Sequence, residues 1–178
     1  QNPFTGYNGD NVSVPGEDRQ LFNIRDAYYV DEHYFNVFGI KIQEGSNFDP
    51  TLNSDAEMIV DRNFVKMMKN TAGWDDVLGR EVMVTSHEAG PVRICGIIDD
   101  MHTGGFSVAE ADFGGRPMGI FYCDSEKYAG MFHYIFVKYH RMSPEMLQKT
   151  DEITGKILDG QWHRVITCNE LAASNFVD

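Results

Sequence analysis

The sequence predicts an α+β fold, and three observations lead to this prediction. Its 178 residues fit one medium-sized domain or two small subdomains that share a core. Hydrophobic residues make up 42% and charged residues 24% of the chain, an ordinary globular mixture that can bury a core. Segments with a strand pattern and segments with a helix pattern are interspersed along the chain, with no internal repeat.

Strand patterns, either alternating or rich in aromatic and β-branched residues, occur in eight segments. They are residues 21–30, 40–45, 56–61, 80–86, 91–99, 117–123, 132–140 and 163–168. Residues 87–90 (HEAG) separate the fourth segment from the fifth, which predicts a hairpin with Gly90 in its turn. The Gly-, Asn- and Pro-rich residues 1–19 predict irregular structure, and residues 169–176 begin a short closing helix.

The sequence DEHYFNVFG predicts a short helix with both of its ends marked. Asp31 can cap the N-terminus by accepting a backbone N–H, and Gly39 can end the helix in a left-handed conformation. Val30 and Phe35 suit a hydrophobic staple across the first turn, and Ile40 can fold back on Phe35. The acidic residues in the first turn favour the helix dipole, which is a structural role.

Two longer amphipathic helices are predicted. The first covers residues 62–70, and its apolar stripe consists of Phe64, Val65 and Met68. The second covers residues 143–160, with Ser143 as its N-cap and Gly160 at its end. Its apolar stripe consists of Met146, Leu147, Thr150, Ile153, Ile157 and Leu158. Together with the strands on either side, this helix predicts a β-α-β unit over residues 132–168.

The charge of the chain argues against several classes of partner. Fifteen basic residues stand against 27 acidic ones, a formal net charge of −12, which repels nucleic acids and anionic headgroups. No apolar run approaches the roughly 20 residues that cross a bilayer. Because the chain starts at Gln1 and carries no signal peptide, we expect it to be an excised soluble portion of a longer protein.

The most tempting reactive cluster is formed by Asp99, Asp100 and His102, which follow an apolar strand. Oxygen and imidazole ligands at a strand end could bind a divalent metal. Zinc sites usually need three or four ligands, however, and no second His/Cys cluster is present to complete one. Acidic residues at strand ends also form turns, and we expect that structural role. We therefore predict no catalytic residue, no cofactor-binding residue and no metal ligand.

Other reactive residue types are scattered. The remaining histidines are His33, His87, His133, His140 and His163, and no nucleophile elbow accompanies them, so no hydrolase triad is expected. Neither glycine pair, at 104–105 and 114–115, has a phosphate-loop pattern, so any ATPase must belong to another polypeptide or another segment. The three cysteines, Cys95, Cys123 and Cys168, permit at most one internal disulfide.

Taken in order, these motifs resemble the MacB-like periplasmic core domain of FtsX-type ABC transporter permeases. That family shows a strand, an aromatic helix, a Gly-Ile pair and a turn with glycine and phenylalanine. The matching residues are Tyr34, Phe35, Gly39, Ile40, Gly45 and Phe48, whereas Ser46 stands where arginine is common. Further similar stretches are residues 56–68, 77–84, 92–106 and 133–139, so the resemblance covers nearly the whole chain.

The resemblance implies a domain on the periplasmic face of the bacterial cytoplasmic membrane, anchored by flanking transmembrane helices. It also implies two lobes: residues 1–30 plus 125–178 form a membrane-proximal lobe, and residues 31–124 form an inserted small α/β lobe. The aromatic helix would pack near the crossing between them. The domain would not be catalytic and would hold no cofactor of its own.

The partners follow from the same resemblance. A cytoplasmic ABC ATPase would use ATP and drive the transmembrane part of the permease, and this domain would relay the movement. A second permease copy or a paralogue, and an outer partner such as a periplasmic adaptor, would complete the assembly. No nucleic acid is expected.

Two alternatives stay open. A periplasmic module that senses or binds a small ligand would need a concave, mostly apolar pocket between its lobes, with a few convergent polar groups. A metal-dependent enzyme would use Asp99, Asp100 and His102, and would therefore bind a metal ion.

Overall fold

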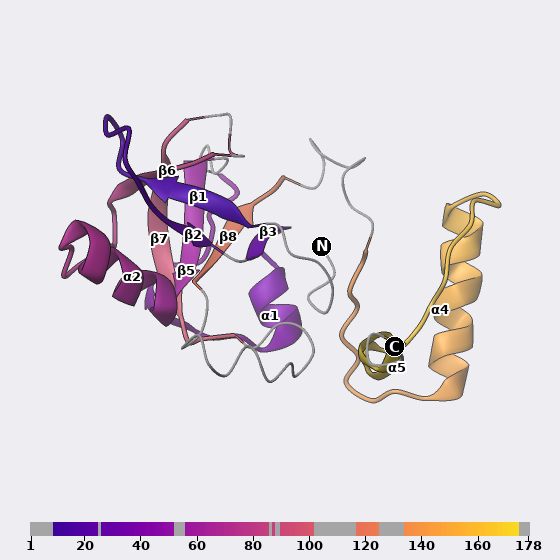
Figure 1. The fold of residues 1–178 in the computed structure, drawn as a ribbon. Helices are drawn as coiled ribbons and strands as arrows, with labels where there is room; N and C mark the ends of the chain where they lie inside the picture. The colour runs from indigo at the N-terminus through magenta and orange to yellow at the C-terminus, as the bar shows by residue number, and fades with distance from the viewer. Residues whose placement is uncertain are drawn as a thin grey trace. The chain divides into compact units, whose positions relative to one another are not determined.

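The computed structural model describes residues 9–24, 26–51, 56–85, 87, 90–101, 117–124 and 134–174. The chain divides into two compact units, Gln1–Phe136 and Val137–Asp178, hereafter unit 1 and unit 2. Helices and strands are both present, so the predicted α+β class is confirmed (Figure 1). None of the helices within the described ranges is long and apolar enough to cross a membrane.

Unit 1 is built around a mixed β-sheet (Figure 1). Its described strands are β1 (Asp10–Ser13), β2 (Gln20–Ile24), β3 (Asp26–Val30), β4 (Ile42–Gly45), β5 (Glu57–Asp61), β6 (Glu81–Val84), β7 (Val92–Ile98) and β8 (Met118–Tyr122). They lie in the order β2-β1-β6-β7-β5-β8-β3, and β4 also pairs with β7. The pairs β5–β7 and β3–β8 are parallel, and the other pairs are antiparallel.

Each face of this sheet carries its own hydrophobic core. Along β5, Met58 and Val60 face one core and Ile59 faces the other, because successive residues of a strand point to opposite faces. Helix α2 (Arg62–Ala72) packs on the first core, and helix α1 (Tyr34–Phe38) packs on the second. All five residues of β5 are therefore buried.

Helix α2 begins at the predicted residue, Arg62, and extends two residues beyond its predicted end, to Ala72. The Asp61 carboxylate accepts the N–H of Phe64 at 2.8 Å, and Gly73 ends the helix with a left-handed φ of 70°. Phe64 and Met68 are fully buried, and Val65 packs partly buried against the same core, so the predicted apolar stripe is confirmed.

Two predictions for the start of the chain are wrong. Residues 1–19 were expected to be irregular, but Asp10–Ser13 form β1, which pairs with β2 and β6. Residues 21–30 were expected to form one strand, but they break into β2, antiparallel to β1, and β3, parallel to β8. Strands of four or five residues are too short for their pattern alone to identify them, so distant pairing decides.

The sheet of unit 1 includes strands from the start of the chain, while the division into two lobes stays a prediction. Strands β1 to β3 share one sheet with β5 to β8, so the described part of residues 1–30 lies with residues 31–124 in unit 1. The break between the two units falls between Phe136 and Val137.

Unit 2 contains α4 (Pro144–Ile157) and α5 (Cys168–Ser174), close to the helices predicted. The hydroxyl of Ser143 accepts the N–H of Met146 at 3.3 Å, which confirms the predicted N-cap. The strands predicted on either side of α4 are not formed: the described residues 134–142 and 161–167 belong to no β-ladder. A strand pattern specifies alternation but not the partner whose backbone groups must complete the ladder.

Side chains attach these two segments to α4. The hydroxyl groups of Tyr139 and Thr150 are hydrogen-bonded, and Nε2 of His163 lies 3.2 Å from Oδ1 of Asp151. No described side chain of unit 2 is fully buried, and the predicted apolar stripe of α4 is only partly covered. Its exposed members are Met146, Ile153 and Ile157.

Candidate functional site

The short aromatic helix α1 is fixed by a side-chain hydrogen bond before its start and by a backbone hydrogen bond at its end. The Asp31 carboxylate accepts the N–H of His33 at 3.0 Å, so Asp31 holds the turn that leads into the helix, and His33 occupies the N-cap position. Gly39 ends the helix with a left-handed φ of 70°, and the N–H of Ile40 donates to the carbonyl of Phe35 at 2.8 Å. The predicted ending is confirmed, and the predicted cap lies two residues further along the chain.

A continuous series of ring contacts runs from the second core to the end of unit 1. In order of contact its members are Tyr122, Phe48, Phe35, Tyr34, Phe38, Phe136 and Tyr134. Their centroid separations lie between 4.8 and 6.3 Å, a range in which aromatic pairs attract. The first four rings are at most 7% exposed, Phe38 and Phe136 are half-buried, and Tyr134 is 44% exposed.

The hydroxyl of Tyr34 contributes little to this arrangement. The residue is 6% exposed, and its hydroxyl is buried without a hydrogen-bond partner among the described residues. Burial, followed by the nearby Tyr28, raises the pKa of Tyr34 above its ordinary value, so the phenol stays protonated. A buried hydroxyl without a partner costs roughly 1–3 kcal/mol, so packing of the ring holds Tyr34 in place.

Two glycines allow β4 and β7 to approach closely. Gly45 has a φ of 78°, and a Cβ atom there would lie 2.2 Å from the carbonyl oxygen of Cys95. A Cβ atom on Gly96 would lie 2.6 Å from the carbonyl oxygen of Ser46, whose N–H donates to the Cys95 carbonyl at 2.9 Å. Both glycines belong to the motifs that carry the family resemblance, and the structure gives a steric reason for them.

Asp99 belongs to a polar network at the end of β7. The side-chain amide of Gln43 donates to its carboxylate at 2.6 Å, and the guanidinium of Arg62 lies 3.9 Å from it. Arg62 also pairs with Glu44. These contacts join β4, β7 and α2 and are sufficient to explain an acidic side chain at this position.

Asp100 binds the N-terminus of α2, where its carboxylate accepts the N–H of Asn63 at 3.0 Å. The helix dipole favours a negative charge at this end. His102, the third residue of the cluster, lies outside the described residues. In the described ranges, no group of three or more His, Cys, Asp or Glu side chains could hold a metal ion. The contacts of both aspartates fit the structural role that the sequence indicates.

The buried carboxylate of Asp61 is a feature that was not predicted from the sequence. This residue is 1% exposed, and besides capping α2 it accepts the N–H of Met118 in β8 at 3.1 Å. Burial raises its pKa to about 6, against the opposing effect of the hydrogen bonds from Met118 and Phe64. One carboxylate therefore ties α2 to β8. The available signal is an aspartate placed between a buried strand and an amphipathic helix.

The cysteines lack the features of a reactive thiol pair. Cys95 and Cys123 are buried, Cys168 is exposed, and the three form no disulfide. Burial raises the pKa of Cys95 to about 12, so its thiolate is scarce near neutral pH.

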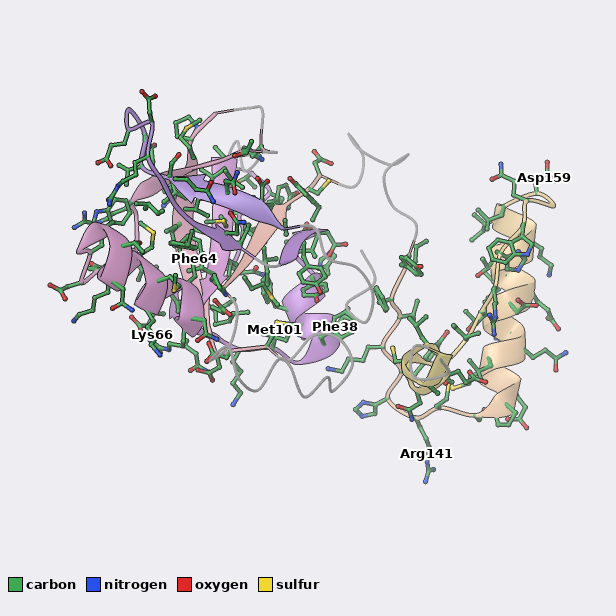
Figure 2. The ribbon with its side chains drawn as sticks, in the orientation of Figure 1. Phe38, Phe64, Lys66, Met101, Arg141 and Asp159 are labelled. Atoms are coloured by element: carbon green, nitrogen blue, oxygen red, sulfur yellow. The ribbon has the colours of Figure 1, made fainter. Side chains whose placement is uncertain are left out.

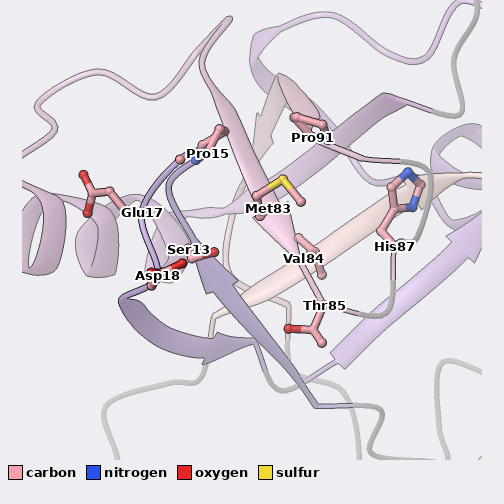
Figure 3. A pocket seen from close by; sticks show the side chains of 10 residues that line it. Ser13, Pro15, Glu17, Asp18, Met83, Val84, Thr85, His87 and Pro91 are labelled. Carbon is pink, nitrogen blue, oxygen red and sulfur yellow. The ribbon is translucent and has the colours of Figure 1, made fainter.

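A depression of about 590 Å³ lies in unit 1 (Figure 3). Its lining residues come from the turns that follow β1 and β6 and from the strands beside them: Ser13, Pro15, Gly16, Glu17, Asp18, Met83, Val84, Thr85, His87 and Pro91. The volume suits a small ligand. Figure 3 nevertheless shows Glu17 and His87 on opposite sides of Met83, so these polar groups do not converge. The lining comes from residues 13–18 and 83–91, which fall in the two different lobes expected from the sequence and both belong to unit 1.

No family model matches the chain, and no characterised protein sequence matches it. Solved structures do match. The periplasmic region of MacB from Actinobacillus actinomycetemcomitans has a TM-score of 0.54 and 13% identity, over 97% of this chain and 73% of that one. The extracellular domain of the ABC-type transporter YknZ from Gram-positive bacteria has a TM-score of 0.54 and 14% identity, over 88% and 74% of the two chains.

A third similar structure is a domain assigned to a permease protein from Porphyromonas gingivalis. It has a TM-score of 0.52 and 14% identity, over 95% of this chain and 84% of that one. The chain therefore has the fold of a MacB-like periplasmic domain, and the resemblance seen in the motifs is confirmed at the level of the fold.

Proposed function

We propose that this chain is the extracytoplasmic domain of an ABC transporter permease and that it relays ATP-driven conformational change across the cytoplasmic membrane. The observation that carries the proposal is the fold, shared over 88% to 97% of the chain with the MacB, YknZ and permease domains. Flanking transmembrane helices would anchor it, and a cytoplasmic ATPase would supply the energy.

A relay of this kind needs a body that moves as one piece rather than a reactive centre. Unit 1 has the contacts of such a body: α2 is tied to β8 through Asp61, and β4 lies against β7 at Gly45 and Gly96. Asp99 and Asp100 are engaged with neighbouring groups of the protein. The chain is thus proposed to be non-catalytic, with ATP hydrolysed by a separate nucleotide-binding subunit or domain.

The test uses the full-length protein coexpressed with a candidate ABC ATPase from the same genome. We expect the protein to stay in the membrane fraction after a carbonate wash and to copurify with the ATPase in detergent. A second permease copy or paralogue, and an outer adaptor, are the other partners that copurification should retain. Recovery of the full-length protein as a free secreted polypeptide would overturn the proposal.

The second candidate is a ligand-sensing module, for which the depression beside Met83 has a suitable volume although its polar groups do not converge. Thermal unfolding of the domain against a panel of small metabolites tests it. A stabilising compound whose effect is lost in Met83→Trp, a substitution that fills the depression, would support sensing. Equal stabilisation of both proteins would place the compound elsewhere.

A further inference from the structure

The last residue of unit 1 is held by an aromatic contact. The ring of Phe136 lies 4.9 Å from that of Phe38, at an interplanar angle of 65°. Val137, the next residue, begins unit 2. We propose that Phe38 and Phe136 form a clasp that fixes the point at which the chain leaves unit 1, and that movement passes between the units through it. The part concerning movement rests on the proposed function; the clasp itself does not.

Helix α1, which carries Phe38, is held firmly in unit 1. Phe38 is the last residue of α1, and its ring lies 4.8 Å from that of Tyr34, which is 6% exposed (Figure 2 labels Phe38). Gly39 closes the helix immediately after Phe38. At the other end of α1, the side-chain amide of Asn47 donates to the carbonyl of Glu32 at 2.8 Å. This bond ties the turn before α1 to the residues that follow β4.

Residues 134–136, which contact α1 through Phe136, have few other contacts among the described residues. Within the described part of the chain, residues 134–136 join no β-ladder and make no backbone hydrogen bond to the sheet. Ile135 is 89% exposed, whereas Phe136 is half-buried, so the segment presents one ring to unit 1 and turns its neighbour to solvent. Tyr134 lies against Phe136 at 6.3 Å and at 21°, which adds a second ring to the segment.

The strength of the Phe38–Phe136 contact suits a clasp that can open and close. An aromatic pair of this geometry changes the population of the detached state by roughly 2- to 12-fold. A contact of this size is small beside the free energy of unfolding of a whole domain, so it can open while unit 1 stays folded.

Chymotrypsin offers a direct test on the 178-residue chain, since it cleaves after aromatic residues and needs a detached, extended segment. With trace protease, the cleavage rate follows the detached population. Mass spectrometry identifies the bonds cut. We expect Phe38→Ala to raise cleavage after Tyr134 by roughly 2- to 12-fold. Phe38→Leu keeps most of the apolar volume, so it should raise the cleavage rate less. This variant is the control for a misfolded Phe38→Ala protein.

The matched control is Tyr29→Ala, which removes a half-buried ring stacked on Phe121 at 5.2 Å in the first core. This variant should leave cleavage after Tyr134 unchanged. The double variant Phe38→Ala/Phe136→Ala should be cleaved after Tyr134 no faster than either single variant, because both remove the same contact. Unchanged cleavage in Phe38→Ala, equal acceleration in Tyr29→Ala, or additive effects in the double variant would overturn the clasp. None of these results depends on whether the full-length protein is membrane-anchored, so the two proposals fail separately.

Discussion

Replacing Asp61 by alanine is expected to lower the free energy of unfolding by roughly 2–4 kcal/mol, because one carboxylate serves two buried donors. Loss of its bond to the Phe64 N–H, at 2.8 Å, removes the N-cap of α2, which costs about 1 kcal/mol. The N–H of Met118, now 3.1 Å from the same oxygen, would stay buried without a partner, at a cost of about 1–3 kcal/mol.

The same carboxyl group makes stability depend on pH. Burial raises the pKa of Asp61 from 3.8 to about 6. Between these values the folded chain holds a proton that the unfolded chain has released. The contribution of this group to stability therefore grows as pH falls through 6, and it is fully present below 3.8. At pH 4.5 it amounts to about 2 kcal/mol relative to pH 7.

Asp61→Asn is the matched variant, since its amide oxygen can accept the same N–H groups but does not titrate. Urea unfolding followed by circular dichroism gives the free energy of unfolding for both proteins at pH 7 and pH 4.5. We expect the difference between wild type and Asp61→Asn to shift by about 2 kcal/mol in favour of the wild type at pH 4.5. Identical pH dependence of the two proteins would show that Asp61 stays ionised, and would refute the reasoning.

Gly45→Ala should lower the free energy of unfolding by more than about 3 kcal/mol, whereas Gly39→Ala should lose only about 1–2 kcal/mol. Both glycines have a left-handed φ, but only at Gly45 would a Cβ atom meet a backbone carbonyl. Equal losses of stability in thermal unfolding of the two variants would contradict this account. Tyr34→Phe should be neutral or stabilising by about 1 kcal/mol, and a clear loss would reveal a partner for the hydroxyl. Maleimide should label Cys168 alone in the native chain and all three cysteines after denaturation, as counted by mass spectrometry.

Features that depend on neighbouring residues could be predicted from the sequence. The end of α1 at Gly39, the stripe of α2 at Phe64 and Met68, and the cap of α4 at Ser143 are all confirmed. Each depends on contacts within a few residues, which a sequence pattern records directly. The close approach at Gly45 is likewise marked by its motif, although the steric cause becomes visible only in the structure.

Features that depend on distant partners could not be predicted. Asp10–Ser13 becomes a strand because β2 and β6 pair with it, and its four residues carry too little pattern to show this. Residues 134–140 carry a strong strand pattern and yet join no ladder among the described residues. The bond between Asp61 and Met118 spans 57 residues, so the sequence reveals at most the local half of its role.

The central proposal, that this domain moves when a separate ATPase binds ATP, is tested most directly by a distance measurement in the full-length protein combined with the ATPase that copurifies with it. Spin labels at the exposed Cys168 of unit 2 and at Lys66→Cys on α2 of unit 1 report the separation of the two units by pulsed electron paramagnetic resonance. We predict different distance distributions in the nucleotide-free and ATP-trapped states. The Asp61→Asn variant, which leaves the Phe38–Phe136 clasp intact, should give the same distributions as the wild type. Superimposable distributions in the two nucleotide states would contradict the account.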